Sequence, residues 1–402
     1  MEINMEGIKA SVDAVIDEIV DIRHDIHRHP EIGRKEVRTA ELIRKKLKEY
    51  GVDEISTPMP TGTVALIKGT KGPGKCVALR TDIDALPVQE DTDLPFASEV
   101  PNMMHACGHD IHCSMMLGVA KVLCENRDKF PGTVKLIFQP SEDTLPGGAK
   151  EMTENGVLDN PKVDAIFGMH VMPDPELVGK VAIKAGALTS AVDLYDVTIT
   201  GKGGHGSYPH TTQDPILAAA QMITAMQQIV ARKIDPLDTG IMSIGSIHSG
   251  DAPNVIPAVC KFGGVSRAYS DEARKTISDQ MYKIAEGIRH ISDCDVDIYK
   301  YEGYPSTIND ARMVDCVKDA VKEELGEEAL IELDVPYSFS EDFSYYSSMT
   351  GIPSAFFMVY AGQGTEESYP LHSPKIVFNE DVMPYGIRAM ANTAITYLNG
   401  DY

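Results

Sequence analysis

Apolar residues recur along the chain at helical and strand spacings, and they predict an alternating α/β order. Val12, Val15 and Ile19 follow one another at steps of three and four, which predicts an amphipathic helix ending before Pro30. Further helices are expected at 35–50, 114–125, from 310 and at 379–398. Short apolar runs predict strands buried on both faces at 63–68, 76–80, 133–138, 163–169 and 354–360. This alternation is typical of the α/β class.

The pattern changes after Gly186. A strand, a helix, two strands, a helix and a strand are expected at 193–200, 214–232, 240–248, 258–266, 271–291 and 295–301. The order β-α-β-β-α-β is that of a ferredoxin-like α+β domain. We therefore predict a larger α/β domain in two parts, 1–187 and 304–402, with a smaller domain inserted at 188–303.

Composition and charge narrow the function classes. The chain has 402 residues, of which 43% are hydrophobic, enough for a sizeable core. The net charge of −23 argues against nucleic acid and anionic membranes as partners, since both require clustered Lys and Arg. The N-terminus lacks the pattern of a secretory signal, and no apolar run approaches the ~18 residues of a membrane span. Seven scattered cysteines predict no disulfide framework, which favours the cytoplasm and leaves thiolates free for metal.

Carboxylates and an imidazole follow three of the predicted strands. Asp82 and Asp84 come after the strand at 76–80, Glu142 and Asp143 after the strand at 133–138, and His170 after the strand at 163–169. In open α/β sheets the carboxyl ends of strands form the binding edge. One of two adjacent carboxylates can bind metal while the other serves as general base. The alternative is that the acidic pair begins a solvated helix near residue 147.

A thiol and imidazoles are concentrated in the segment 105–112. Cys107 and His109 flank Gly108, which allows a tight turn. Thiolate and imidazole bind zinc and similar borderline metals. A structural zinc site typically has paired C-x-x-C cysteines, which this sequence lacks, so the mixed donor set favours a catalytic site with open positions. The competing interpretation is a set of buried polar groups that are hydrogen-bonded to the backbone.

Motifs spread from about residue 20 to 395 resemble one known family. They read RHDIHRHPEIG, RTDIDALP, HACGHDIH, FQPSED with GGA, FGMHVMP, GKGGHGSYPH, NVIP, FSEDFSYY and PLHSPKIVFNE. The resemblance is to the amidohydrolase/aminoacylase branch of the two-metal aminoacylase/carboxypeptidase family. That branch includes hippurate hydrolases, N-acetyl-amino-acid deacetylases and plant auxin-conjugate hydrolases. The resemblance implies a mixed-sheet, two-metal, peptidase-like catalytic domain, with the inserted domain acting as a lid and dimerisation domain.

The resemblance also implies roles for individual residues. Glu142 is implied as the general base, and His205 as a histidine that reaches across a dimer to polarise the scissile carbonyl. Asn254 and Arg267 match positions near the substrate carboxylate. Asp82 and Asp84 match an acidic pair behind the metals, although relatives outside this branch have a histidine ligand at the position of Asp82. The implied metal ligands are Cys107, His109, Asp143, His170 and His372.

The implied activity is metal-dependent hydrolysis of the amide bond of N-acyl amino acids, such as N-acetyl or N-benzoyl derivatives, by a cytoplasmic homodimer or higher homo-oligomer. Two divalent ions per subunit are expected, zinc first, with manganese, cobalt or nickel as alternatives. A metallo-carboxypeptidase or dipeptidase is the nearest rival, and a non-catalytic metal- or ligand-binding protein is a rival from another class. Glu142 argues against the latter, because binding alone needs no base. One departure is Asp143, where the family pattern usually has a longer glutamate.

Overall fold

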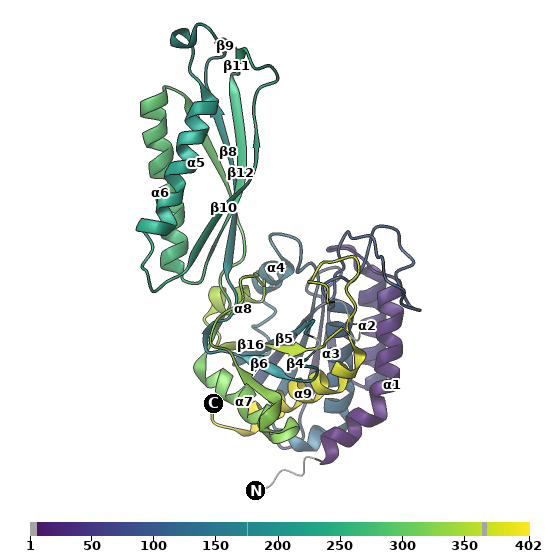
Figure 1. Ribbon diagram of the computed structural model, residues 1–402. Helices are drawn as coiled ribbons and strands as arrows, with labels where there is room; N and C mark the ends of the chain where they lie inside the picture. Colours follow the sequence, from purple (N-terminus) through teal and green to yellow (C-terminus); the bar gives the residue numbers. More distant parts are fainter. Residues whose placement is uncertain (1–5, 175, 364–367) are drawn as a thin grey trace. The chain divides into compact units, whose positions relative to one another are not determined.

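The computed structural model describes residues 6–174, 176–363 and 368–402, and these form two compact units (Figure 1). Unit 1 contains Met1–Leu188, Ile308–Pro336 and Asp342–Tyr402. Unit 2 contains Thr189–Thr307 and Tyr337–Glu341. The expectation about an N-terminal signal falls partly on residues 1–5, which lie outside the described residues. The role of unit 2 as a lid and dimerisation domain stays a prediction.

Unit 1 is built on an eight-stranded mixed sheet, in the order β1-β2-β4-β3-β5-β16-β6-β15. Strands β4, β3, β5 and β16 run parallel, whereas β2 pairs antiparallel with β4. The strands are β1 (Glu54–Ser56), β2 (Thr63–Lys68), β3 (Cys76–Asp82), β4 (Thr133–Gln139), β5 (Ala165–Met172), β6 (Val181–Ile183), β15 (Leu330–Glu332) and β16 (Ser354–Tyr360). The central strands are almost fully buried, as their continuous apolar runs predicted.

Helices cover this sheet and bury their apolar faces against it. The helices of unit 1 are α1 (Glu6–Arg28), α2 (Val37–Tyr50), α3 (His109–Glu125), α4 (Gly148–Glu154), α7 (Ala311–Leu325), α8 (Ser344–Thr350) and α9 (Met383–Asn399). In α1, the stripe that includes Val12, Val15 and Ile19 is buried, as its spacing predicted. Helix α2 ends at Gly51, which adopts the left-handed conformation at φ +77°. Among the described residues, no helix is both long and apolar enough to cross a membrane.

Unit 2 has the ferredoxin-like order, with an antiparallel sheet β10-β12-β8-β13. Its elements are β8 (Ala191–Thr200), α5 (Pro215–Arg232), β10 (Gly240–His248), β12 (Val259–Ala268), α6 (Asp271–Ser292) and β13 (Asp295–Glu302). Helices α5 and α6 lie side by side on one face of the sheet (Figure 1) and share a core with it. Asp214 and Ser270 cap the two helices by accepting backbone N–H bonds. The predicted α/β fold class with a ferredoxin-like α+β portion is therefore confirmed.

Short elements complete the chain. They are the strands β7 (Gly186–Ala187), β9 (Gly204–His205), β11 (Val255–Ile256) and β14 (Ile308–Asn309), and the 3-10 turns η1 (Arg127–Lys129), η2 (Pro209–Thr211), η3 (Glu327–Ala329) and η4 (Glu380–Val382). β7 pairs with β14, and β9 pairs with β11. The β9–β11 ribbon carries His205, so this histidine stands on paired backbone.

Three predicted boundaries are wrong in ways that matter for the site. Helix α3 begins at His109 rather than at residue 114, because Gly108 in the left-handed region at φ +90° turns the chain directly into the helix. Strand β5 continues to Met172, since it pairs with β16 as far as Tyr360, so His170 lies within the strand rather than after it. Helix α9 begins at Met383 because η4 precedes it, with Asn379 as its side-chain cap.

Candidate metal centre

The predicted site residues of unit 1 gather at the carboxyl edge of its parallel strands. Asp82 is the last residue of β3, and Asp84 follows it in the next turn. Glu142 and Asp143 lie in the loop after β4, while His170 projects from β5. Because β3, β4 and β5 run parallel, their carboxyl ends bring these side chains to a common edge.

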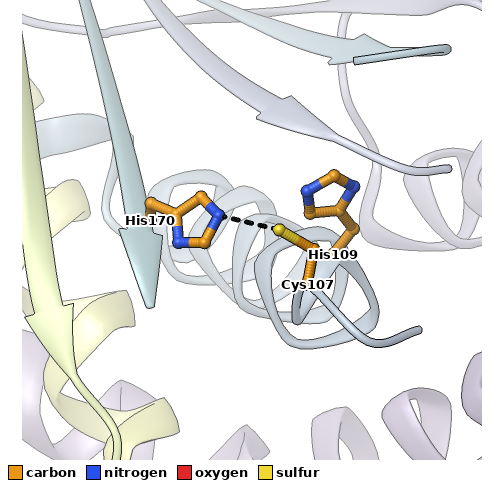
Figure 2. A group of neighbouring side chains, drawn as sticks. All are labelled: Cys107, His109 and His170. Atoms are coloured by element: carbon orange, nitrogen blue, oxygen red, sulfur yellow. Dashed lines mark hydrogen bonds between the residues drawn. The ribbon is translucent and has the colours of Figure 1, made fainter. Parts of the chain in front are cut away.

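One group of potential ligands consists of Cys107, His109 and His170. Their ligand atoms lie within 4.8 Å of one another, and all three residues are buried. Figure 2 shows the Cys107 sulfur between the two imidazole rings, with His170 Nε2 at 3.3 Å from Sγ. Gly108 makes this approach possible, because a Cβ at that position would lie 2.6 Å from Val171 Cγ2. A side chain at Gly108 would force apart the turn that aims Cys107 and His109.

A second group consists of Cys107, Asp143 and His372, again with ligand atoms within 4.8 Å. His372 Nε2 lies 3.3 Å from Cys107 Sγ and 3.6 Å from Asp143 Oδ1. Ligands 2.0–2.3 Å from a tetrahedral zinc ion are about 3.3–3.8 Å apart, which is close to these spacings. The two groups share the sulfur of Cys107, so a single thiolate stands between two sets of donors.

Hydrogen bonds leave the metal-facing nitrogen atoms in position for coordination. His109 Nδ1 is 2.9 Å from the Asp84 carbonyl oxygen, and His170 Nδ1 is 2.6 Å from the Val171 carbonyl oxygen. A carbonyl only accepts, so each Nδ1 carries a proton, and Nε2 is the ring nitrogen that can bind a metal when the imidazole is neutral. His109 Nε2 and Asp143 Oδ2 are buried and have no hydrogen-bond partner among the described residues. These atoms fit a divalent metal, which would satisfy both.

Burial governs the charge of this cluster. Burial and the neighbouring Asp143 raise the pKa of the Cys107 thiol to about 12. Burial also raises the pKa of the Asp143 carboxyl. The Cys107 thiol therefore requires a cation to become a thiolate at neutral pH, and a metal that binds thiolate directly supplies that charge.

Asp84 fixes the loop that carries the acidic pair. Its Oδ1 accepts the Glu142 N–H at 2.9 Å, and its Oδ2 accepts the Asp143 N–H at 3.1 Å. Glu142 is buried, and its Oε1 accepts the Asp342 N–H at 3.4 Å. Its Oε2 lies 4.0 Å from His109 Nε2. Asp84 therefore acts on the backbone, while Glu142 presents an oxygen toward the ligand cluster.

Both carboxylate oxygens of Asp82 form hydrogen bonds with neighbouring side chains, which makes this residue a weaker candidate for a metal ligand. Arg80 Nη1 donates to its Oδ2 at 2.8 Å, and His112 Nδ1 lies 2.7 Å from its Oδ1. His112 Nε2 accepts the Val171 N–H at 2.8 Å, so the His112 proton sits on Nδ1 and is donated to Asp82. Burial opposes the charge of Asp82, but His109, His112 and Arg80 outweigh it and hold its pKa well below the usual range.

Sequence reasoning missed the buried polar network behind the site. Arg80 also donates to Asp342 Oδ1 at 2.7 Å and to Gln139 Oε1 at 2.8 Å. Gln139 donates in turn to both Asp342 oxygens. The available signal was a charged residue, Arg80, directly after the apolar run 76–79 in a strand that is fully buried. Such a residue must find partners in the interior.

Unit 2 carries the other predicted residues at two separate places. His205 is exposed on β9, and the Asn254 carbonyl accepts the N–H of Gly206 beside it at 2.8 Å. Arg267 lies near the opposite end of β12 and donates to Ser340 Oγ at 2.8 Å. At 3.3 Å per residue, the strand separates the two places by roughly 25 Å. The chain therefore brings His205 and Asn254 together, but it does not bring Arg267 to them.

Comparisons with known proteins agree with this geometry. Residues 78–396 match the model of peptidase family M20/M25/M40. Thermostable carboxypeptidase 1 of Saccharolobus solfataricus is 39% identical, with 98% of this chain and 99% of that protein covered. Hippurate hydrolase of Campylobacter jejuni is 38% identical, with 94% and 96% covered. The crystal structure of Bacillus subtilis YXEP, a dinuclear metal binding peptidase, superposes with a TM-score of 0.82 at 34% identity, covering 96% and 99%. As the motifs predicted, the chain belongs to peptidase family M20/M25/M40.

Proposed function

We propose that this enzyme hydrolyses the amide bond of N-acyl amino acids and releases a carboxylic acid and a free amino acid. The observation that carries the proposal is the pair of three-donor groups sharing Cys107, with Glu142 beside them. The names of two relatives support the substrate class: hippurate hydrolase of Campylobacter jejuni and N-acetylcysteine deacetylase of Bacillus subtilis, which are 38% and 37% identical.

The proposed metal ligands form two sets around one sulfur. Cys107 belongs to both sets, with His109 and His170 in one and Asp143 and His372 in the other. Sulfur, imidazole and carboxylate donors favour zinc, with manganese, cobalt and nickel as the alternatives. When bound, such ions lower the pKa of water and polarise a carbonyl oxygen. A cytoplasmic location follows from the need to keep Cys107 reduced.

Glu142 is the proposed general base. It accepts a proton from the attacking water as the oxygen bonds to the acyl carbon, and it later delivers a proton to the amide nitrogen as the C–N bond breaks. Its Oε1 is held by the Asp342 N–H, and its Oε2 faces the ligand cluster near His109. Burial of the carboxylate excludes bulk water and keeps its oxygen aimed in one direction.

We also propose a homodimer in which each subunit completes the other's site. His205 and Asn254 lie at one end of the unit 2 sheet and Arg267 near the other, so one chain cannot direct all three at a single small substrate. Two chains can do so, with Arg267 from one subunit and the partner's His205. In this arrangement Arg267 would bind the substrate carboxylate, and the partner's His205 would donate to the carbonyl oxygen of the scissile amide.

A substrate panel tests the proposal. The enzyme, stripped of metal and reloaded with each candidate ion, is assayed on N-acetyl and N-benzoyl amino acids and on dipeptides with a free amino terminus. We expect turnover of the N-acyl compounds, and a loss of about 10²- to 10⁴-fold in kcat for Glu142→Gln at unchanged metal content. A Glu142→Gln variant with wild-type turnover would contradict the role of the base.

A metallo-carboxypeptidase or dipeptidase is the second candidate function. It is favoured by the similarity to thermostable carboxypeptidase 1 of Saccharolobus solfataricus over nearly the whole chain. The same panel separates the two candidates, because cleavage of dipeptides in preference to N-acyl amino acids would support the peptidase. Both functions use the same ligand set and the same base.

A further inference from the structure

Ser141 adopts an unusual backbone conformation just before the acidic pair. Its φ is +59°, in the left-handed region that costs free energy for a residue with a side chain. Glu142 and Asp143 follow directly, so the torsion angles of Ser141 set the direction in which both carboxylates leave the loop. Something in the surrounding structure must therefore hold Ser141 in place.

Glu36, from a distant part of the sequence, provides that contact. Its carboxyl group is fully buried, and Oε1 accepts the Ser141 N–H at 2.8 Å. Glu36 is the N-cap residue of α2, yet its side chain does not cap that helix. Glu31 does so instead, by accepting the N–H groups of Arg38 and Thr39 at 3.0 and 2.9 Å. The Glu36 carboxyl is thus directed at the loop of the base instead of at its own helix.

The segment before α2 is fitted closely to the same loop. A Cβ at Gly33 would lie 2.8 Å from Ser141 Oγ and 3.2 Å from Ser141 Cα, so only glycine allows this approach. The Glu31 carbonyl also accepts the Ala85 N–H at 2.9 Å, which ties the segment to the turn after β3. Residues 31–36 therefore support both loops that contribute carboxylates to the site.

Two carboxyl groups together restrain three consecutive N–H groups. Glu36 binds the N–H of Ser141, and Asp84 binds those of Glu142 and Asp143. The Ser141 carbonyl also accepts the Gly148 N–H at 2.9 Å, so Glu36 is the contact that holds Ser141 on its N–H side. Without Glu36, that side of the residue loses its acceptor and the left-handed conformation can relax. Such a relaxation would swing the Glu142 carboxylate away from the reacting water, although the metal ligands outside this loop would stay in place.

We propose that Glu36 is a positioning residue for the reaction: by holding Ser141 in the left-handed conformation, it sets the place of the Glu142 carboxylate. This inference rests on the proposed role of Glu142 as general base. Burial raises the pKa of Glu36 to about 7, so a neutral side chain with the same shape is a close substitute. Glutamine retains a carbonyl oxygen for the Ser141 N–H, whereas leucine has a similar volume and no acceptor.

The first test compares Glu36→Leu with Glu36→Gln. We expect Glu36→Leu, assayed at saturating metal, to lower kcat by about 10- to 100-fold, the effect of leaving a buried donor unpaired, with KM close to wild type. Glu36→Gln should restore most of kcat. Glu324→Leu is the stability control, because it removes a buried carboxylate that pairs with Arg388 at 2.6 Å in another part of the unit. Equal loss of kcat in all three variants would overturn the proposal.

A second-site variant tests the route through Ser141. Glycine tolerates positive φ, so Glu36→Leu combined with Ser141→Gly should recover activity relative to Glu36→Leu alone. Gly33→Ala crowds Ser141 without touching the carboxyl group, and it should lower kcat even if Glu36→Leu folds poorly. Unchanged kcat in Gly33→Ala, or no recovery in the double variant, would contradict the proposed route.

Hydrogen exchange gives a readout that does not depend on turnover. The amide of Ser141 should exchange faster in Glu36→Leu than in Glu36→Gln or wild type, when followed in peptides covering 139–145. Unchanged exchange would overturn the inference, whatever the activity. Glu142→Gln is assayed in parallel: if it stays active, the proposed function itself fails. If it is inactive while Glu36→Leu keeps wild-type kcat, only the inference about Glu36 fails.

Discussion

Replacing Asp84 by asparagine probes how the acidic loop is held. In the wild type, the two Asp84 oxygens accept the Glu142 and Asp143 N–H groups at 2.9 and 3.1 Å. An asparagine side chain has one carbonyl oxygen and one NH2 group, so one of the two backbone donors would face another donor. The His109 ring keeps its place in this variant, because its Nδ1 donates to the backbone carbonyl of residue 84 rather than depending on the side chain alone.

The size of the effect follows from the lost bond. A hydrogen bond to a charged acceptor contributes about 1.5–3 kcal/mol, and an unpaired buried donor costs a similar amount. If the lost hydrogen bond displaces Glu142, the activation barrier rises by a similar amount and kcat falls by about 10- to 100-fold, since 1.4 kcal/mol is a factor of ten. If it displaces Asp143, metal affinity falls by about 10- to 100-fold, as for other residues that orient ligands.

Two measurements separate these outcomes for Asp84→Asn. Turnover of an N-acyl amino acid at saturating metal reports on Glu142, and competition with a chelator reports on metal affinity through Asp143. Asp164→Asn is the matched control, because Asp164 also accepts a backbone N–H, that of Cys76 at 2.8 Å, at the opposite end of β3. Wild-type turnover together with wild-type metal affinity in Asp84→Asn would refute the reasoning.

Three further predictions address the thiol, the assembly and the pH dependence of stability. Cys107 should resist alkylation in the metal-loaded enzyme and react after chelation and partial unfolding, and equal labelling in both states would exclude it as a ligand. His205→Ala and Glu142→Gln chains, each inactive alone, should recover activity when mixed, toward half of wild type per mixed dimer, because one of the two sites then carries neither substitution. No recovery after confirmed subunit exchange would mean that His205 acts in the site of its own chain or in none. Burial lowers the pKa of His27, but the Asp110 carboxylate outweighs it and raises the pKa. The stability that protonated His27 contributes is therefore complete below about pH 6.5 and is lost as the pH rises through the pKa of His27 in the folded state. The unfolding free energy of wild type should exceed that of His27→Gln by an amount that shrinks with rising pH. A difference that grows with pH would contradict the pairing of His27 with Asp110.

The sequence predicted the ends of an element correctly where an apolar run is bounded by turn residues. Strands 63–68 and 354–360 have the predicted ends, because their apolar runs are bounded by turn residues on both sides. Cys107, His109 and His170, which the family motifs implied as metal ligands, also lie with their ligand atoms within 4.8 Å of one another, and their role as ligands stays a prediction. The start of α3 did not follow, because a left-handed Gly108 begins the helix where a standard capping side chain would normally be sought.

Long-range hydrogen bonds were beyond the reach of local pattern. The bond from Ser141 to Glu36 and that from Arg80 to Asp342 join residues more than a hundred positions apart. Neither partner is marked by periodicity, and each acquires its role only when the sheet has formed. A buried strand that contains an arginine shows that a partner must exist, but its identity depends on the tertiary structure.

The same loop contacts explain how Asp143 can stand where the family pattern usually has a glutamate. Its Oδ1 lies 3.6 Å from His372 Nε2, and its Oδ2 lies 3.9 Å from His109 Nε2, so the shorter carboxylate stands between the two donor groups. A side chain with one methylene fewer depends more closely on the position of its own backbone. Asp84 holds the Asp143 N–H, and Glu36 holds the loop two residues earlier. We therefore expect Asp84 and Glu36 to set the position of the proposed ligand Asp143 through the backbone of the loop.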